Sequence, residues 1–175
     1  MEDLSLHILD IVENATSAGA TLVEIHIEVD SENNLFALRI RDDGRGMDQE
    51  MLSRVRDPFV TTRRTRRVGL GLSMLEQAAQ EAGGYLRITS QPGRGTEVSA
   101  VFKADHIDRR PLGDIGLTMI SLIVGSPEVD FVCECDLDGE KTSLDTREIK
   151  AEIEGAASIT DPAILKLIRD LFTAN

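Results

Sequence analysis

The chain has 175 residues and a formal net charge of −12, and 41% of its residues are hydrophobic although only 3% are aromatic. This length suits one domain, or one domain with a small appendage, built around a mainly aliphatic core. The negative charge argues against binding to nucleic acid or to an anionic membrane surface, because both would repel the chain. The acidic start Met1-Glu2-Asp3 and the lack of an apolar run of about 18 residues favour a cytoplasmic protein.

Apolar periodicity predicts the elements of the first part of the chain. Leu4 and Ile8 recur at the spacing of a helix, whereas Val23 and Ile25 alternate as in a strand. The short fourth element is expected to be a helix capped by Asp48. The predicted order is helix, two strands, two helices and two strands, at Leu4–Ala18, Leu22–Val29, Leu35–Ile40, Asp48–Val55, Leu70–Ala82, Tyr85–Thr89 and Glu97–Phe102.

The pattern breaks near Asp105–Pro111. A helix at Leu112–Val124 is predicted next, then a hairpin that turns at Asp138-Gly139, and then two helical stretches, the last of them capped by Thr160. We therefore expect one domain over residues 1–105 and a small α+β extension over residues 106–175. The extension is a candidate contact for a partner protein or for a second copy in a homodimer.

Polar residues on the first helix form the first candidate site. Asp10 and Asn14 are four positions apart and share a helix face, and Glu13 lies beside Asn14. An Asn oxygen together with phosphate oxygens would suit magnesium, and a carboxylate one turn away could activate a water. The same residues could equally be ordinary surface polar groups of an amphipathic helix.

Two glycine-containing segments form the second and third candidates. Asp42 follows a strand and precedes Gly44 and Gly46, so the backbone could approach a flat ligand closely while the carboxylate reads an exocyclic amine. Taken alone, an ordinary Asp-Gly turn explains this segment better. The segment Gly69-Leu70-Gly71-Leu72-Ser73 is expected to open a helix and to offer free N–H groups to an anion.

The arginines Arg63, Arg64, Arg66 and Arg67 precede this segment in an otherwise acidic chain. They could neutralise phosphates or dock an acidic partner, or form a solvated basic loop. Cys133 and Cys135 are one residue apart, so a strand would put both on one face. They are expected to be small, half-buried residues, with a redox-sensing pair as the alternative.

The order of these motifs resembles the GHKL (Bergerat-fold) ATPase superfamily over about Leu4 to Lys103. The first helix, with Asp10-Ile11-Val12-Glu13-Asn14-Ala15, is similar to that of MutL-type mismatch repair proteins. The segment Asp57-Pro58-Phe59-Val60-Thr61-Thr62, followed by the Gly69–Ser73 segment, resembles the lid of sensor histidine kinases. Gly93-Arg94-Gly95-Thr96 resembles the final glycine turn of those kinases.

This resemblance implies an α+β two-layer sandwich, in which a mixed, mainly antiparallel sheet carries helices on one face and an ATP lid. It implies ATP and Mg²⁺ as ligands, with Asn14 as the metal ligand and Asp42 on the adenine amine. Asp10 and Glu13 become the candidate catalytic residues. The other implied nucleotide contacts are Gly44, Gly46 and Met47 at the adenine, and Thr96 near Asp42. Gly69, Gly71 and Leu72 are implied at the phosphates, and Thr62 and Leu70 belong to the segment that resembles the lid of sensor kinases.

One departure concerns catalysis. ATPases of the superfamily carry a Glu four residues before the Asn, where this chain has the shorter Asp10, and this leaves the water-activating step open. Sensor kinases carry a phospho-accepting His in a helical hairpin ahead of the domain, which we do not expect here because few residues precede Leu4.

Three functions stay open. The protein could be a stand-alone kinase of a partner protein, as anti-sigma serine kinases are, or a slow regulatory ATPase. It could also be a non-catalytic module whose binding to a partner responds to ATP. The segments Asp108–Asp114 and Asp145–Ile149 resemble those of stand-alone GHKL proteins associated with iron-hydrogenase gene clusters in anaerobes, which points to a redox-related partner.

Overall fold

The computed structural model describes residues 3–55 and 66–173, without the side chains of residues 66–70. The elements are α1 (Leu4–Ser17), β1 (Leu22–Asp30), β2 (Leu35–Asp42), α2 (Gln49–Arg54), α3 (Arg66–Glu81), β3 (Tyr85–Gln91), β4 (Gly95–Lys103), α4 (Ile115–Gly125), β5 (Asp130–Leu137), β6 (Glu140–Asp145), α5 (Thr146–Glu152) and α6 (Pro162–Thr173). No helix among these is both long and apolar enough to cross a bilayer.

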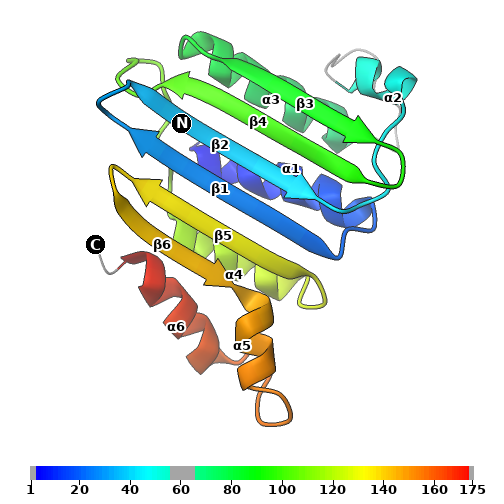
Figure 1. The fold of residues 1–175 in the computed structure, drawn as a ribbon, viewed down its shortest axis with the longest axis vertical. Coiled ribbons are helices and arrows are strands. Elements are labelled where there is room, and N and C mark those ends of the chain that lie inside the picture. Colours follow the sequence, from blue (N-terminus) through cyan, green and yellow to red (C-terminus); the bar gives the residue numbers. More distant parts are fainter. Residues whose placement is uncertain (1–2, 56–65, 174–175) are drawn as a thin grey trace.

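The strands form one sheet in the order β3-β4-β2-β1-β5-β6, and the helices α1, α3 and α4 lie together on one face of it (Figure 1). All neighbouring strands are antiparallel except β1 and β5, which are parallel. This arrangement confirms the predicted α+β fold with a mixed, mainly antiparallel sheet. The predicted lid lies partly in residues 56–65, outside the described residues.

The core lies between the sheet and these helices, and it is mainly aliphatic as the composition predicts. Strand alternation places Ile25, Leu38 and Ala100 on the helix side, where each is at most 2% exposed. Phe36 and Phe102 meet edge to face in this layer, with ring centroids 5.5 Å apart. Both strand pairs of the first part of the chain are therefore half-buried, as their alternating sequence predicts.

The hairpin predicted to turn at Asp138-Gly139 is the pair β5 and β6, and it extends the same sheet because β5 pairs along the whole of β1. The boundary at residues 105 and 106 stays a prediction. Cys133 and Cys135 of β5 lie on one face, as predicted, with their Sγ atoms 4.0 Å apart. They are fully buried rather than half-buried, because this face of β5 joins the common core.

Three helix starts can be compared with the sequence. Asp48 caps α2 as predicted, since its carboxylate accepts the N–H of Met51. The cap predicted at Thr160 is wrong by one residue, because Asp161 accepts the N–H of Ala163 in the first turn of α6. The helix predicted from Leu70 begins at Arg66, because its first polar residues continue the helix without an apolar period.

Candidate functional site

Asp42 is the last residue of β2 and stands at one end of the helix side of the sheet. It follows the buried residues Leu38 and Ile40 at alternate positions, so its side chain points toward the helices. Its neighbours across the sheet are Val23 of β1 and Thr96 of β4. The apolar stripe of the core therefore ends in a carboxylate.

Burial raises the pKa of Asp42, and the nearby charge of Asp43 adds to this effect. The backbone N–H groups of Gly44 and Thr96 act in the opposite direction, and the Gly44 N–H lies 2.8 Å from Oδ1. A desolvated carboxylate that still has acceptor capacity is suited to hydrogen-bond an amine of a ligand.

Glycines allow the loop after Asp42 to pass close to the rest of the site. Gly46 has a φ of 68°, and a Cβ atom there would collide with the carbonyl oxygen of Gln91. At Gly44, a Cβ would lie 2.9 Å from Asp42 Oδ1 and 3.1 Å from the Cβ of Ala18. Both glycines are thus required by close approach of the loop to other parts of the chain, and the predicted approach to a flat ligand stays a prediction.

Ser90 connects this loop to the turn between β3 and β4. Its Oγ accepts the N–H of Met47 at 2.8 Å and lies 2.8 Å from Thr96 Oγ1. The sequence analysis did not select Ser90, although a polar residue that ends the apolar stripe of Leu86 and Ile88 was a usable signal. Ser90 holds Met47 and Thr96, two of the predicted site residues, in one network.

Asp43 was also missed, and its role is structural. Its carboxylate accepts the N–H and the hydroxyl of Thr21, at 2.7 and 2.6 Å, and the N–H of Leu22. Burial raises the pKa of Asp43, but these hydrogen bonds outweigh it and leave that pKa lowered. Asp42 and Asp43 are therefore adjacent acids whose pKa values are shifted in opposite directions.

Helix α1 brings Asn14 to the same end of the sheet. The N–H of Arg45 donates to the carbonyl of Ala18, just after α1, at 2.9 Å, which ties the helix to the glycine loop. The Nδ2 atom of Asn14 is buried and has no partner among the described residues. A buried amide left without a partner costs about 1–3 kcal/mol, so a ligand that accepts this hydrogen bond would be favoured.

Asp10 and Glu13 have exposed side chains on α1. A Cβ atom at Gly71 would lie 3.3 Å from the Cβ of Asp10, so α1 and α3 come close together at this glycine, which has no side chain. Asp10 therefore stands at the junction of the two helices.

The remaining predicted residues lie in or before α3. Leu72 has a side chain buried in the core. The sequence predicts that the helix opens at Gly69–Ser73, but α3 begins at Arg66. The N–H of Gly69 is therefore among the first four of the helix, which have no partner within the helix, whereas the N–H of Gly71 is not. The side chain of Leu70 and the whole of Thr62 lie outside the described residues.

The family model described as "Histidine kinase-, DNA gyrase B-, and HSP90-like ATPase" matches residues 2–106. The chain belongs to this ATPase family. This confirms the resemblance to the GHKL superfamily. The association with iron-hydrogenase proteins stays a prediction.

Curated relatives include sensor proteins and kinases. The "Putative sensor protein" of Shewanella frigidimarina is 35% identical over 101 residues, which are 54% of this chain and 15% of that protein. "Sporulation kinase D" of Bacillus subtilis is 30% identical over 92 residues, covering 53% of this chain and 18% of that kinase. The chain thus spans less than a fifth of the length of these relatives.

Solved structures share the fold. The Aquifex aeolicus MutL ATPase domain complexed with ADP aligns with a TM-score of 0.50 at 21% identity, over 83% of this chain and 63% of that one. The N-terminal domain of a DNA repair protein aligns with a TM-score of 0.53 at 14% identity, over 91% and 59% of the two chains. Because the two alignments cover 83% and 91% of this chain, both extend past residue 106, where the family model ends.

Proposed function

We propose that the protein binds magnesium–ATP at the end of the sheet formed by Asp42, the glycine loop and α1. The observation that carries this proposal is Asp42, a partly buried carboxylate with a raised pKa beside a loop that only glycine allows. Asp42 would accept a hydrogen bond from the adenine amine, while Gly44, Gly46 and Met47 border the base. Membership of the ATPase family and the ADP named in the MutL structure agree with this ligand class.

Asn14 is the residue that fits magnesium and phosphate. Its carbonyl oxygen is the kind of hard donor that Mg²⁺ prefers, and its buried Nδ2, which lacks a partner in the described protein, could donate to a phosphate oxygen. Magnesium would supply charge neutralisation of the phosphates when it is bound. Gly69, Leu70, Gly71, Leu72, Thr62 and Thr96 remain proposed nucleotide contacts.

The proposed role is regulatory, as a kinase-like or ATPase protein that acts on a partner. Asp10 is favoured over Glu13 as the residue near the γ-phosphate, because it stands at the junction of α1 with α3. Its carboxylate could orient or deprotonate a water or a partner hydroxyl. A non-catalytic module that only responds to ATP is the alternative, and a cytoplasmic location is proposed for either.

Calorimetric titration with magnesium–ATP, ADP and GTP tests the binding proposal. Asp42→Asn should weaken ATP binding by roughly tenfold to a hundredfold, the value of a hydrogen bond to a charged group. Asp43→Asn is the matched control, because it makes the same change in charge at a carboxylate turned to the Thr21 backbone. If wild type binds no adenine nucleotide, or if both variants lose affinity equally, the proposal fails.

A separate measurement decides what happens to the γ-phosphate. ATP turnover and transfer of labelled γ-phosphate to co-purified proteins are compared between wild type and Asp10→Asn. Turnover that falls with Asp10→Asn while ATP affinity stays intact supports an ATPase or kinase. Turnover that is unchanged rules out Asp10 as the base and favours the non-catalytic module.

A further inference from the structure

Three polar side chains form a row across the helix side of the sheet, at the end that holds the proposed nucleotide site. Ser90 of β3 lies beside Thr96 of β4, and Thr96 lies beside Asp42 of β2. Each continues the alternation of buried apolar residues in its own strand, so all three side chains point to the same face. The proposed place of the adenine is therefore bordered by two hydroxyls as well as by a carboxylate.

The hydroxyl of Ser90 makes three contacts, and only one placement of the protons serves all of them. Its Oγ accepts the N–H of Met47 at 2.8 Å and donates to the carbonyl oxygen of Gly95 at 3.0 Å. A serine hydroxyl has a single proton and two acceptor positions. Because that proton goes to Gly95, the contact of 2.8 Å between Ser90 Oγ and Thr96 Oγ1 uses the proton of Thr96. Thr96 therefore donates to Ser90.

This placement leaves Thr96 Oγ1 with acceptor positions only on its remaining sides. The neighbouring carboxylate of Asp42 also accepts hydrogen bonds and, when ionised, has none to donate. A ligand edge that meets both groups therefore has to donate hydrogen bonds. An exocyclic amine has two N–H groups and fits this requirement, whereas a carbonyl oxygen at the same position would face two acceptors.

We propose that Ser90 is a positioning residue that makes the site select a 6-amino purine over a 6-oxo purine, because it holds the Thr96 hydroxyl as an acceptor. This inference rests on the proposed binding of ATP beside Asp42. One hydrogen of the adenine amine is donated to Asp42 and the other to Thr96. The oxygen of a 6-oxo purine lies instead against two acceptors, and an opposed polar group weakens binding. Ser90 acts through Thr96 and needs no contact with the base.

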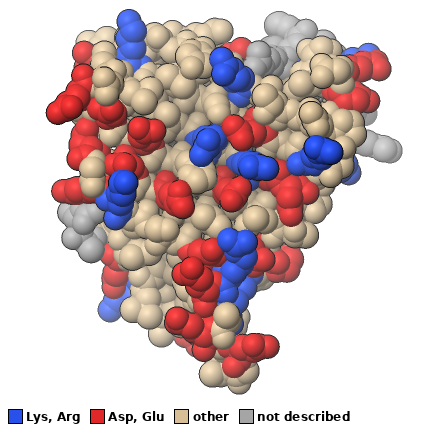
Figure 2. Space-filling view, viewed as in Figure 1, with Lys and Arg blue, Asp and Glu red and all other residues tan. Residues whose placement is uncertain are grey.

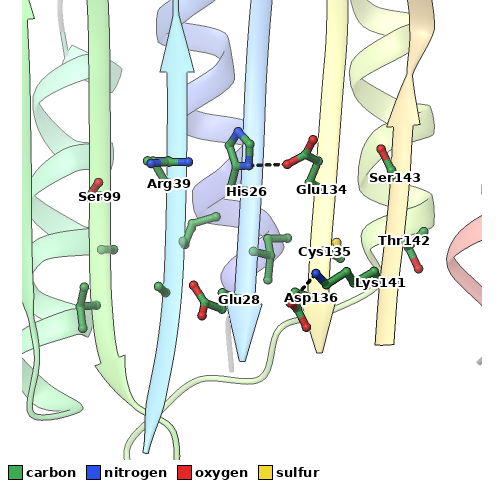
Figure 3. Close-up of a pocket in the computed structure, with 15 residues that line it drawn as sticks. His26, Glu28, Arg39, Ser99, Glu134, Cys135, Asp136, Lys141, Thr142 and Ser143 are labelled. Carbon is green, nitrogen blue, oxygen red and sulfur yellow. Dashed lines mark ion pairs between the residues drawn. The ribbon is translucent and has the colours of Figure 1, made fainter. Parts of the chain in front are cut away.

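The opposite face of the sheet offers a matched control. Figure 2 shows this open face, on which acidic and basic side chains lie side by side. Ser99 of β4 lies three positions after Thr96 and points to the open face, where it lines the groove drawn in Figure 3. Ser99→Ala therefore removes a hydroxyl from the same sheet without reaching the proposed nucleotide site.

Calorimetric titration with magnesium–ATP and with magnesium–inosine triphosphate (ITP) tests the inference, because ITP carries a 6-oxo group where ATP carries the amine. Wild type should prefer ATP. Ser90→Ala frees the Thr96 hydroxyl to donate to the 6-oxo group, so the ratio of the ITP Kd to the ATP Kd should fall about fivefold, the value of one hydrogen bond. Loss of the Met47 contact alone would weaken both nucleotides by the same factor and leave this ratio unchanged. Ser99→Ala should also leave it unchanged.

A double-mutant cycle shows whether Ser90 acts through Thr96. Thr96→Val removes the hydroxyl and should lower the ratio by itself, and adding Ser90→Ala should then change the ratio no further. The inference is overturned if wild type binds ATP and ITP equally well or if Ser90→Ala keeps the wild-type ratio. It is also overturned if Ser90→Ala lowers the ratio equally in the Thr96→Val background, or if Ser99→Ala lowers it as much. Wild type that binds neither nucleotide would contradict the proposed function as well, so the two failures are distinguishable.

Discussion

At the scale of single residues, Asp42 combines a proposed binding role with a cost in stability. Its pKa is raised in the folded protein, mainly by burial, so the folded state holds its proton more strongly than the unfolded state does. Between the unfolded and folded pKa values the unfolded state binds fewer protons, and stability falls as the pH rises. Above the folded pKa the full cost of the buried charge is present.

We expect Asp42→Asn to stabilise the nucleotide-free protein at neutral pH, since the amide removes that charge and can still accept the Gly44 N–H. Thermal unfolding should show equal midpoints for wild type and variant at a pH below the unfolded value of about 3.9. The variant should gain as the pH rises through the raised pKa, and then keep a constant advantage. A variant that is less stable than wild type at pH 7 would contradict the assignment of Asp42 as a desolvated acid.

Asn14 allows a second prediction at this scale. Asn14→Ala removes a buried Nδ2 that has no partner in the described structure, so the nucleotide-free variant should be at least as stable as wild type. Its ATP affinity should no longer respond to magnesium. Titrations with magnesium and with EDTA check this, and an unchanged response to magnesium would remove Asn14 as the metal ligand.

At the scale of elements, the contact of α1 with α3 depends on Gly71. Glycine costs about 1 kcal/mol inside a helix relative to alanine, and here that cost accompanies close packing against Asp10. Gly71→Val would push the helices apart and should lower the free energy of unfolding by about 1–3 kcal/mol. Urea unfolding measures this, with Gly125→Val as the control because a Cβ at Gly125 meets nothing within 4 Å. Equal losses in both variants would contradict the packing argument.

Local patterns predicted the elements well and their ends less well. Alternation identified β1 and β2 to within two residues, because one face of each strand is buried and the other is not. The early start of α3 was missed, since Arg66 and Arg67 show no apolar period. Asp42 and Asn14 could be selected from the motif order. The polar end of the Leu86 and Ile88 stripe could have pointed to Ser90, but its contact with Met47, forty-three positions earlier, could not be predicted from local sequence.

At the scale of the whole molecule, the first and last parts of the chain share one sheet and one core. No local pattern predicted that β5 would pair with β1, since the pairing joins strands about a hundred residues apart. The matched family region ends at residue 106, yet Phe131, Cys133 and Leu144 beyond it lie in the same core cluster as Ile25 and Leu38. Cooperative unfolding follows from a shared core.

We therefore expect one unfolding transition rather than two. Cys133 and Cys135 should be unreactive in the native protein, because both side chains are buried. Their mutual hydrogen bond together with burial raises the pKa of Cys133, whereas the same hydrogen bond, opposed by burial, lowers the pKa of Cys135. Thiol labelling during a urea titration should coincide with the loss of helical circular dichroism. Labelling that precedes this loss would show that β5 and β6 unfold separately from the rest.

The parallel pairing of β1 with β5 also has a consequence for synthesis on the ribosome. Leu22 finds its partner Asp130 only after about a hundred more residues have been made. At about 5–20 residues per second, one edge of β1 stays unpaired in the nascent chain for roughly five to twenty seconds. Because an unpaired edge is a template for aggregation, this interval is when the protein would most need protection by a chaperone.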